Sequence, residues 1–442
     1  MSEVREDLKE PESGAGGDQG GPCPDTATPL VHEASWPDLQ GLPPAGRSSS
    51  ADISPSPPAE TSGLLSLPWE IVTHIASHLP AQCVITVLPK VCHALGIVGK
   101  DSTALQLRAR RLIGPQAGFP VGPREDFDWP AACLEIEQLI TCWKGQASLH
   151  KKALECIALP TDHFAHINSV LLIGGEGKVL ATGSRDRTVK LWDLQAGSSG
   201  TLLHTLVGHQ GWVWCLACRG SLLASGGFDS TVRLWDLQAG CAERGLIRAG
   251  AAVLCLSCQP DVLLAGAFDK RVSMYDTRVA EPLVKSLCLH GGAVMCLAAD
   301  DKYIISGGKD CTVSVYDRRA GKGLQKVRLN SYLRSISYSG SEIWAGDNKG
   351  TLHSFSMRAG SFKILSQFDV GHTAAVNVIH SSPGSLYTCS SDRTVKVHIP
   401  CAPPRTLCTL HYQAEVSGLS VDAGVLAVAS GDVCLEVWRP RK

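Results

Sequence analysis

The chain has 442 residues, of which 44% are hydrophobic and 19% charged, an ordinary globular composition with room for two or three domains. Its 41 basic and 42 acidic residues give a formal net charge of -1, so no chain-wide charge indicates nucleic acid or an anionic membrane as a partner. No apolar run reaches the ~18 residues of a membrane helix and the acidic start lacks a secretory signal, so we expect a soluble protein of the cytoplasm, the nucleus or both, with its 18 cysteines as packed thiols.

The N-terminal part divides into a tail and a short apolar segment. Residues 1–62 are rich in Gly, Pro, Ser and acidic residues without apolar periodicity, which predicts a disordered tail. Pro68 then suits the first turn of a helix, Pro80 ends it, and four aliphatic residues between them form one stripe at every fourth position: Leu67, Ile71, Ile75 and Leu79. A second helix from about Ala81 and a third over 91–95 would complete a unit whose core is too small to be stable alone. The stripe therefore either packs within its own domain or binds a partner.

Two further segments before residue 152 have helical period. They are "ALQLRARRL" and "CLEIEQLITCW", and neither carries a pattern of chemically active residues. We predict that residues 107–151 form a helical spacer.

From residue 152 to the C-terminus one pattern repeats. "GSRDRTVKLWDLQAG" at 183–197 returns as "GGFDSTVRLWDLQAG" at 226–240, and each copy is written as four short strands separated by Gly and Asp turns. The position of Trp192 recurs at steps of 39 to 43 residues, in Trp235, Tyr275, Tyr316, Phe355, His398 and Trp438. A period near 40–45 is typical of propeller blades, and the length holds seven of them.

These residues carry a resemblance to the seven-bladed WD-repeat β-propellers. The His, Ser/Thr, Asp and Trp hydrogen-bonded set of that family matches His209, Ser225, Asp229 and Trp235 in the second copy, and His166, Thr182, Asp186 and Trp192 in the first. Later copies keep less of the set, and Lys349 replaces the turn Asp of the fifth, so we expect those blades to rely more on packing. Because a ring of sheets must close, we also predict that residues 154–159 add the outer strand of the last blade.

The segment before the propeller resembles an F-box. "LPWEIVTHIASHL" followed by "VCHAL" is similar to this helical module, which docks on the SKP-type adaptor of cullin-based ubiquitin ligases. Over residues 63–106 the resemblance implies adaptor contacts from Leu64, Leu67, Pro68, Ile71, Ile75, Leu79, Val91 and Leu95. The expected fold is mainly β: a disordered tail, a small all-α F-box, a helical linker and a seven-bladed propeller over 152–442.

The order of F-box and propeller resembles the F-box/WD-repeat proteins, the substrate receptors of SCF-type ligases. That resemblance implies a non-catalytic subunit that holds the adaptor and cullin scaffold at one end and a protein substrate at the other. A propeller scaffold with an idle F-box-like segment is the alternative. A nucleic-acid-binding propeller is disfavoured by the near-zero net charge, and we expect no membrane partner.

No pattern in the sequence indicates catalysis or a cofactor. Cys215-x-x-Cys218 and Cys255-x-x-Cys258 have the spacing of a zinc site. Residues three apart on a strand point to opposite faces, however, so one metal ion cannot reach all four thiols. Nucleophile elbows, P-loops and metalloprotease motifs are absent from the sequence, and we expect no catalytic residue, metal or cofactor.

Basic and aromatic residues lie beside the predicted turns. In the propeller family these turns meet on one face around the channel, and the residues concerned are Arg185, Arg187, Trp212, Lys270, Lys309, Tyr332, Arg334 and Arg393. Forked guanidinium groups and aromatic anchors are typical of protein interfaces. We hypothesise that this face binds an acidic or phosphorylated segment of a protein substrate; the alternative is that exposed charges here only keep the surface soluble.

Overall fold

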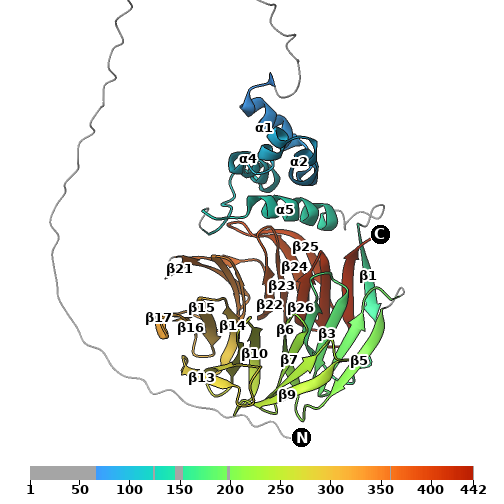
Figure 1. The fold of residues 1–442 in the computed structure, drawn as a ribbon, viewed down its shortest axis with the longest axis vertical. Coiled ribbons are helices and arrows are strands. Elements are labelled where there is room, and N and C mark those ends of the chain that lie inside the picture. The colour runs from blue at the N-terminus through green and yellow to red at the C-terminus, as the bar shows by residue number, and fades with distance from the viewer. Residues whose placement is uncertain (1–65, 123–124, 145–152, 197–199, 359, 442) are drawn as a thin grey trace, which may run out of the picture. The chain divides into compact units, whose positions relative to one another are not determined.

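The computed structural model describes residues 66–122, 125–144, 153–196, 200–358 and 360–441, so the predicted tail and Leu64 lie outside the described residues. The described part begins with helices and continues as strands (Figure 1). The helices are α1 (Trp69–His78), η2, one turn of π-helix (Cys83–Val87), α2 (Leu88–Val91), α3 (His93–Val98), α4 (Ser102–Ile113) and α5 (Trp129–Trp143). Among the described helices, none is both long and apolar enough to cross a membrane.

The strands form seven antiparallel four-stranded sheets, which confirms the seven predicted blades. From the innermost strand of each sheet to the outermost, they are β2–β5 (Ile167–Ile173, Val179–Ser184, Thr188–Asp193, Thr201–Val207), β6–β9 (Val213–Arg219, Leu222–Gly227, Thr231–Asp236, Ala242–Arg248), β10–β13 (Val253–Cys258, Leu263–Ala267, Arg271–Tyr275, Leu283–Cys288), β14–β17 (Val294–Ala299, Tyr303–Gly308, Thr312–Asp317, Lys322–Arg328), β18–β21 (Leu333–Ser339, Glu342–Asp347, Thr351–Arg358, Ser361–Asp369), β22–β25 (Val376–Ser381, Leu386–Ser390, Thr394–Ile399, Arg405–His411) and β26–β27–β28–β1 (Val416–Asp422, Val425–Ser430, Leu435–Pro440, Leu154–Leu159).

The seventh sheet closes the ring. Strand β1 pairs with β28 from Leu154 opposite Pro440 to Leu159 opposite Leu435, so the first strand of the repeat region completes the last blade. This confirms the strand predicted over residues 154–159. The pairing covers a strand edge that would otherwise be free, and it fastens the two ends of the repeat region together.

Every innermost strand carries a β-bulge after its first residue. The register shifts there in all seven sheets and leaves one residue without a ladder partner: Asn168, Trp214, Leu254, Met295, Arg334, Asn377 and Ser417. A bulge re-aims the side chain that it carries. All seven of these side chains line the central cavity between the blades.

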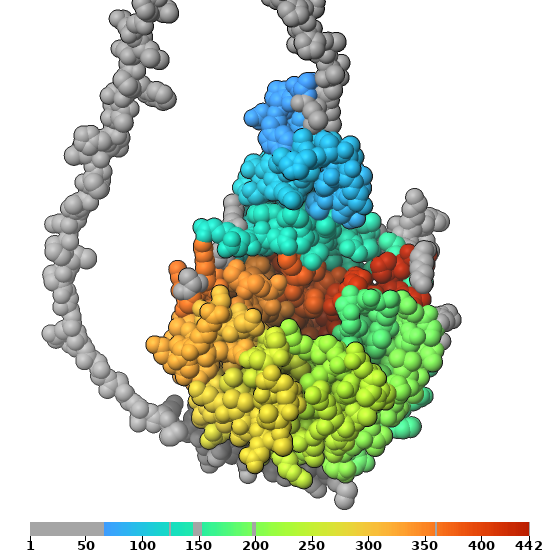
Figure 2. All heavy atoms as spheres, viewed as in Figure 1, coloured from blue at the N-terminus to red at the C-terminus, as the bar shows by residue number. Residues whose placement is uncertain are grey.

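The linker helices fasten the F-box-like helices to the propeller. Helix α5 packs on β24 and β25 within one apolar core that also includes Leu105 of α4, and Glu135 of α5 accepts the backbone N–H of Gly384 at 2.8 Å. Arg108 of α4 is buried and donates to Glu137 of α5 at 2.5 Å and to the carbonyl of Ala76 at 2.6 Å. The atoms of α4 and α5 therefore lie between those of α1 and the propeller (Figure 2).

The short helices differ in detail from the prediction. The third helix begins at His93, because Cys92 is extended and its thiol caps the N–H of Leu95. The residues Cys83–Val87 form a π-turn that runs directly into α2.

Candidate protein-interaction sites

Helix α1 has one buried and one exposed apolar face. Val72 and Ala76 pack with Leu95 and Val98 in the small helical core. The predicted stripe lies on the other face, where its side chains remain 36–46% exposed: Leu67 40%, Ile71 46%, Ile75 39% and Leu79 36%. The stripe therefore does not pack within its own domain, so the first of the two interpretations left open by the sequence is wrong.

The other residues of the expected adaptor surface divide by exposure. Pro68 is exposed at the N-cap of α1, and Val91 is 66% exposed on α2. Leu95 is only 8% exposed because it packs in the core beside Val72 and Val84, so its expected role as a surface contact is wrong. Sequence reasoning missed three exposed apolar residues in this region: Trp69 at 39%, Val87 at 47% and Ile97 at 48%. The four-residue spacing of Val87 and Val91 could have indicated one of them.

In the second blade the four family residues are hydrogen-bonded in series. Trp235 Nε1 donates to Ser225 Oγ at 2.9 Å, and the His209 ring connects Ser225 at 2.8 Å with Asp229 at 2.9 Å. Burial lowers the pKa of His209 despite the nearby Asp229 carboxylate, which favours the neutral ring. The relay satisfies polar atoms that would otherwise be unpaired inside the blade.

In the first blade the relay uses His163, so the expectation for His166 is wrong. His163 Nδ1 lies 2.6 Å from Asp186 Oδ2, and its Nε2 lies 2.8 Å from Thr182 Oγ1. The ring nitrogens of His166 have no hydrogen bond within the described residues; its Nε2 is 3.4 Å from Glu415 Oε1, and it lines the central cavity. The cause is loop length, because the relay histidine stands 23 residues before the turn Asp here but 20 before it in the second blade.

The sixth blade also has a complete relay, contrary to the expectation that it relies on packing. His372 bonds to Asp392 and to Thr388, both at 2.8 Å, and Thr388 Oγ1 lies 3.1 Å from Nε2 of His398, which replaces the Trp. Burial lowers the pKa of His398 to about 3, so its ring is neutral. The fifth blade lacks the turn Asp and instead pairs the buried Asp347 with His353 at 3.2 Å.

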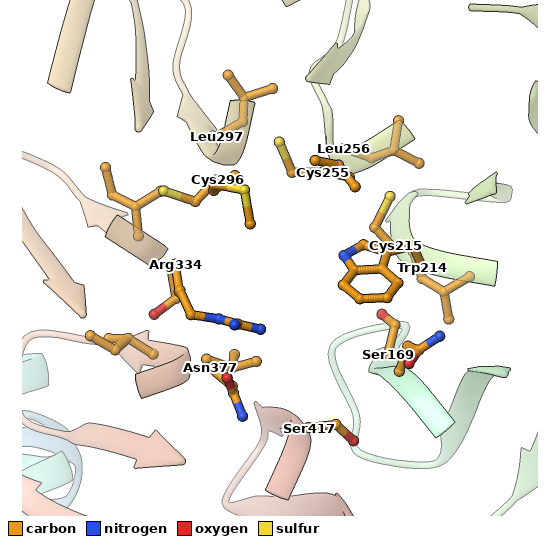
Figure 3. Close-up of a pocket in the computed structure, with 18 of the residues that line it drawn as sticks. Ser169, Trp214, Cys215, Cys255, Leu256, Cys296, Leu297, Arg334, Asn377 and Ser417 are labelled. Atoms are coloured by element: carbon orange, nitrogen blue, oxygen red, sulfur yellow. The ribbon is translucent and has the colours of Figure 1, made fainter. Parts of the chain in front are cut away.

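The central cavity has a volume of about 480 Å³ and is lined by the innermost strands of all seven blades (Figure 3). Of the eight predicted substrate-binding residues, Arg185 and Arg334 line it. Arg185 donates to Asn168 Oδ1 at 3.1 Å and lies 5.0 Å from the ring centre of Trp212. Arg334 extends into the cavity, and its guanidinium has no hydrogen-bond or ion-pair partner within the described ranges.

The other predicted substrate residues lie outside the cavity. Arg187, Lys270 and Arg393 directly follow the turn Asp of their blades, where the backbone takes φ of 73°, 72° and 69°, and their side chains are exposed. Lys309 is exposed and Tyr332 half-buried, and Trp212 is 44% exposed. The structure thus does not gather these basic residues in one pocket.

Sequence reasoning missed an aromatic group on the same end of the blades. Phe228 lies 5.5 Å from the ring of Trp212 and 5.4 Å from that of Trp214, and Phe268 of the next blade is 58% exposed. The signal was present: Phe228 and Phe268 stand directly before a turn Asp, where the first blade has Arg185.

The two cysteine pairs do not converge. Cys215 and Cys255 line the cavity, whereas Cys218 and Cys258 do not. Burial raises the pKa of Cys218 to about 11 and that of Cys258 to about 12, which keeps these thiols protonated. Over the described ranges, no group of three or more His, Cys, Asp or Glu side chains could hold a metal ion.

A closed ring of seven four-stranded sheets, several of which contain a buried hydrogen-bond relay, defines the larger part of the described chain as a WD-repeat β-propeller. The WD40 family model, described as "WD domain, G-beta repeat", matches residues 154–193, 200–236, 281–317 and 362–398. The propeller is preceded by a small helical unit with an exposed apolar stripe.

Comparison with known proteins identifies the family of the whole chain. The chain is 45% identical over 394 residues to F-box/WD repeat-containing protein 9 of Bos taurus, which covers 87% of this chain and 84% of that protein. It is 43% identical over 385 residues to the protein of the same name from Homo sapiens, and the match covers 85% of this chain and 82% of that protein. F-box/WD repeat-containing protein mec-15 of Caenorhabditis elegans is 26% identical over 174 residues, 36% of this chain and 40% of that protein. The chain therefore belongs to the F-box/WD-repeat proteins, which confirms the resemblance.

Proposed function

We propose that this chain is the substrate-recognition subunit of an SCF-type E3 ubiquitin ligase. Its helical unit binds the SKP-type adaptor and, through it, the cullin scaffold, while the cavity end of the propeller binds a protein substrate. The subunit acts by holding the substrate near the ubiquitin-transfer machinery, which raises the effective concentration of the reacting groups. We expect it to act in the cytoplasm, the nucleus or both.

The exposed stripe of α1 is the observation that carries this proposal. Four large aliphatic side chains, two on α1 and one at each of its ends, are 36–46% exposed, although Val72 and Ala76 of the same helix are packed in the core. Complete burial of one such side chain contributes about 1.5–3 kcal/mol, so a partner that covers the stripe gains several kcal/mol. An exposed contiguous apolar face of this kind marks a protein-binding surface.

A role by positioning, without catalysis, is supported by where the acid–base pairs lie. In His163, His209 and His372 the Nδ1 atom bonds to the Asp partner inside the blade, and the Nε2 atom bonds to the Ser or Thr of the relay. Their hydrogen-bonding capacity is used within the fold, and none of the three lines the central cavity.

On the substrate side we propose an acidic or phosphorylated protein segment as the ligand. Arg185 and Arg334 would meet it in the cavity, and Arg187, Lys270, Lys309 and Arg393 outside it, with Trp212 and Tyr332 as aromatic contacts. Replacing Arg185, Arg187 and Arg393 together with Glu should change the set of proteins captured in cells. An unchanged set would exclude these three residues from substrate binding.

The test of the ligase role is a pull-down of the SKP-type adaptor and the cullin with the full chain. We expect Leu67→Ala/Pro68→Ala/Ile71→Ala to lose both partners. Leu283→Ala/Val284→Ala is the matched control, because these aliphatic residues of β13 are 58% and 59% exposed but lie on the propeller. Absence of both partners from the wild type would refute the proposal and favour the scaffold alternative.

A further inference from the structure

Each blade presents an equivalent pair of residues at the end where its innermost strand begins. The residue directly before the turn Asp, or before Lys349 in the fifth blade, donates its backbone N–H to the carbonyl of the residue one position before that strand. The seven pairs are Arg185 with His166, Phe228 with Trp212, Phe268 with Ala252, Lys309 with Ala293, Asn348 with Tyr332, Ser391 with Ala375, and Gly431 with Glu415. Because the register is the same in every blade, these mouth positions can be compared directly, together with the bulge residue beside them.

The mouth positions divide into two arcs. The blades β6–β9, β10–β13 and β14–β17 place mainly apolar side chains there, and we call six of them the apolar arc: Trp212, Trp214, Phe228, Leu254, Phe268 and Met295. Ring contacts of 5.5 and 5.4 Å lead from Trp212 through Phe228 to Trp214, which enters the cavity. Only β6–β9 and β10–β13 have Phe directly before the turn, and the other five blades have Arg185, Lys309, Asn348, Ser391 and Gly431 there, so the fold of a blade does not require an aromatic ring at this position. Large aromatic side chains left 42–58% exposed are typical anchors for a partner.

The other four blades form the second arc, whose side chains are mainly polar, and the guanidinium of Arg334 in this arc has no partner within the described residues. Arg334 enters the cavity from the side facing Trp214 (Figure 3). The Oδ1 of Asn377 beside it is buried without a donor. Arg185 is already bonded to Asn168 and stacked on Trp212, so Arg334 is the unpaired guanidinium among the described residues of the cavity lining.

The charge of the lining limits what Arg334 can accept. Two guanidinium groups, Arg185 and Arg334, and one carboxylate, Glu415, sum to one positive charge. A single carboxylate neutralises that charge and matches the fork of Arg334 with two parallel hydrogen bonds. A phosphate brings about -1.5 to -2 charges and would face Glu415 as well, which leaves negative charge uncompensated.

We infer that the cavity mouth binds an unphosphorylated protein segment in which an apolar side chain stands beside an Asp or Glu. The apolar side chain packs on the apolar arc, and the carboxylate pairs with Arg334 across the cavity. The inference deepens the proposed function, on which it rests, since it names the chemistry of the substrate segment. Within the proposed substrate surface it assigns the carboxylate to Arg334 and the apolar side chain to Phe228 and its neighbours in the apolar arc.

The test selects an unphosphorylated library of random displayed peptides on the purified full chain. We expect enrichment of peptides that hold Leu, Phe, Trp or Met near Asp or Glu. Fluorescence anisotropy with one selected peptide should show binding weakened about tenfold to a hundredfold by Arg334→Gln and by Phe228→Ser. The matched controls are Arg244→Gln, an exposed guanidinium on the outermost strand β9 and outside the cavity lining, and Phe164→Ser, a 91% exposed ring outside the apolar arc, and both should bind as the wild type.

Charge reversal separates specific pairing from loss of fold. Selection on Arg334→Glu should replace Asp and Glu in the enriched peptides by Lys and Arg. The inference is overturned if no motif is enriched, if binding requires a phosphorylated residue, or if Arg334→Gln and Arg244→Gln behave alike. Selection needs no adaptor, so these outcomes are independent of the pull-down that tests the ligase role.

Discussion

Replacing His163 and His166 in turn by Ala tests the assignment of the first-blade relay. Both histidines lie in the loop before β2, three positions apart. The His163 side chain is fully buried and bonds at both nitrogens, whereas the His166 side chain is 14% exposed and its ring nitrogens have no hydrogen bond within the described residues. We therefore expect the two substitutions to have very different effects on stability.

The magnitude for His163→Ala follows from what the imidazole leaves behind. Thr182 keeps the indole N–H of Trp192 at 3.1 Å, and Asp186 keeps the backbone N–H and hydroxyl of Thr188 at 2.9 and 2.6 Å. Each buried partner thus loses one bond but retains others, which places its cost toward the lower part of the ~1–3 kcal/mol range for an unpaired group. Adding the cavity left by the ring, we expect about 2–4 kcal/mol. For His166→Ala we expect less than ~1 kcal/mol, because no hydrogen bond is lost.

Thermal unfolding of the full chain measures the difference. The shift is about 2–4 °C per kcal/mol for domains of about 150–250 residues and lies toward the lower end for this longer propeller, so His163→Ala should lower the melting temperature by roughly 5–10 °C. His166→Ala should change it by about 2 °C or less. Equal losses in the two variants, or a larger loss for His166→Ala, would refute the relay described for this blade.

Three further predictions address other parts of the fold. The pKa of His398 is about 3 in the folded chain and its ordinary value is 6.5, so its contribution to stability is present above pH 6.5 and is lost as the pH falls toward 3. Between about pH 7.5 and pH 5 this group accounts for about 2 kcal/mol, and His398→Trp should therefore lose less melting temperature over that range than the wild type. An equal loss in both proteins would contradict this. Arg108→Met breaks a buried ion pair and should destabilise the helical unit by about 3 kcal/mol, seen as faster limited proteolysis before residue 113, whereas the exposed Arg110→Met on the same helix should not. Gly350→Ala should cost about 2–5 kcal/mol in thermal unfolding, because φ at Gly350 is +93° and the new Cβ would clash with the His372 carbonyl. Gly340 has φ of +64° with open space around it, so Gly340→Ala should cost only about 1–2 kcal/mol. Similar losses in the two variants would argue against the clash.

The sequence predicted those features that the repeat itself dictates. A Trp, or another ring side chain in its place, recurs at one period, with a turn Asp in six of the seven copies, so the number of blades could be counted, and ring closure then required a strand near Leu154. The relay of the first blade could not be counted in the same way. The loop before β2 holds two histidines. The spacing of 20 residues seen in the second blade predicts His166, but the loop of the first blade is three residues longer and places His163 in the relay. Only the packed structure shows which imidazole reaches Thr182.

For α1 too, the sequence pattern predicted one feature of the surface, and only the packing of the helices shows the other. Period four along α1 grouped the stripe correctly on one face, but periodicity alone does not say whether that face is inward or outward. Val72 and Ala76 decide it, because these smaller side chains form the packed face while the larger ones stay in water. Leu95 belongs to the packed set for the same reason, since α3 turns it toward α1.

The division of the mouth positions follows from what each part of a blade must satisfy. A relay residue is buried and leaves unpaired polar atoms if it is replaced, so folding restricts the side chains that it accepts, as in the His, Ser or Thr, and Asp of the first, second and sixth blades. A mouth position needs only its backbone N–H and carbonyl for the pair that it makes, and a bulge residue needs no ladder partner at all. Folding therefore leaves the side chains there free to vary, and their concerted variation over adjacent blades, as in Trp212, Phe228 and Phe268 opposite Arg334, is what the proposed binding at the cavity mouth would require.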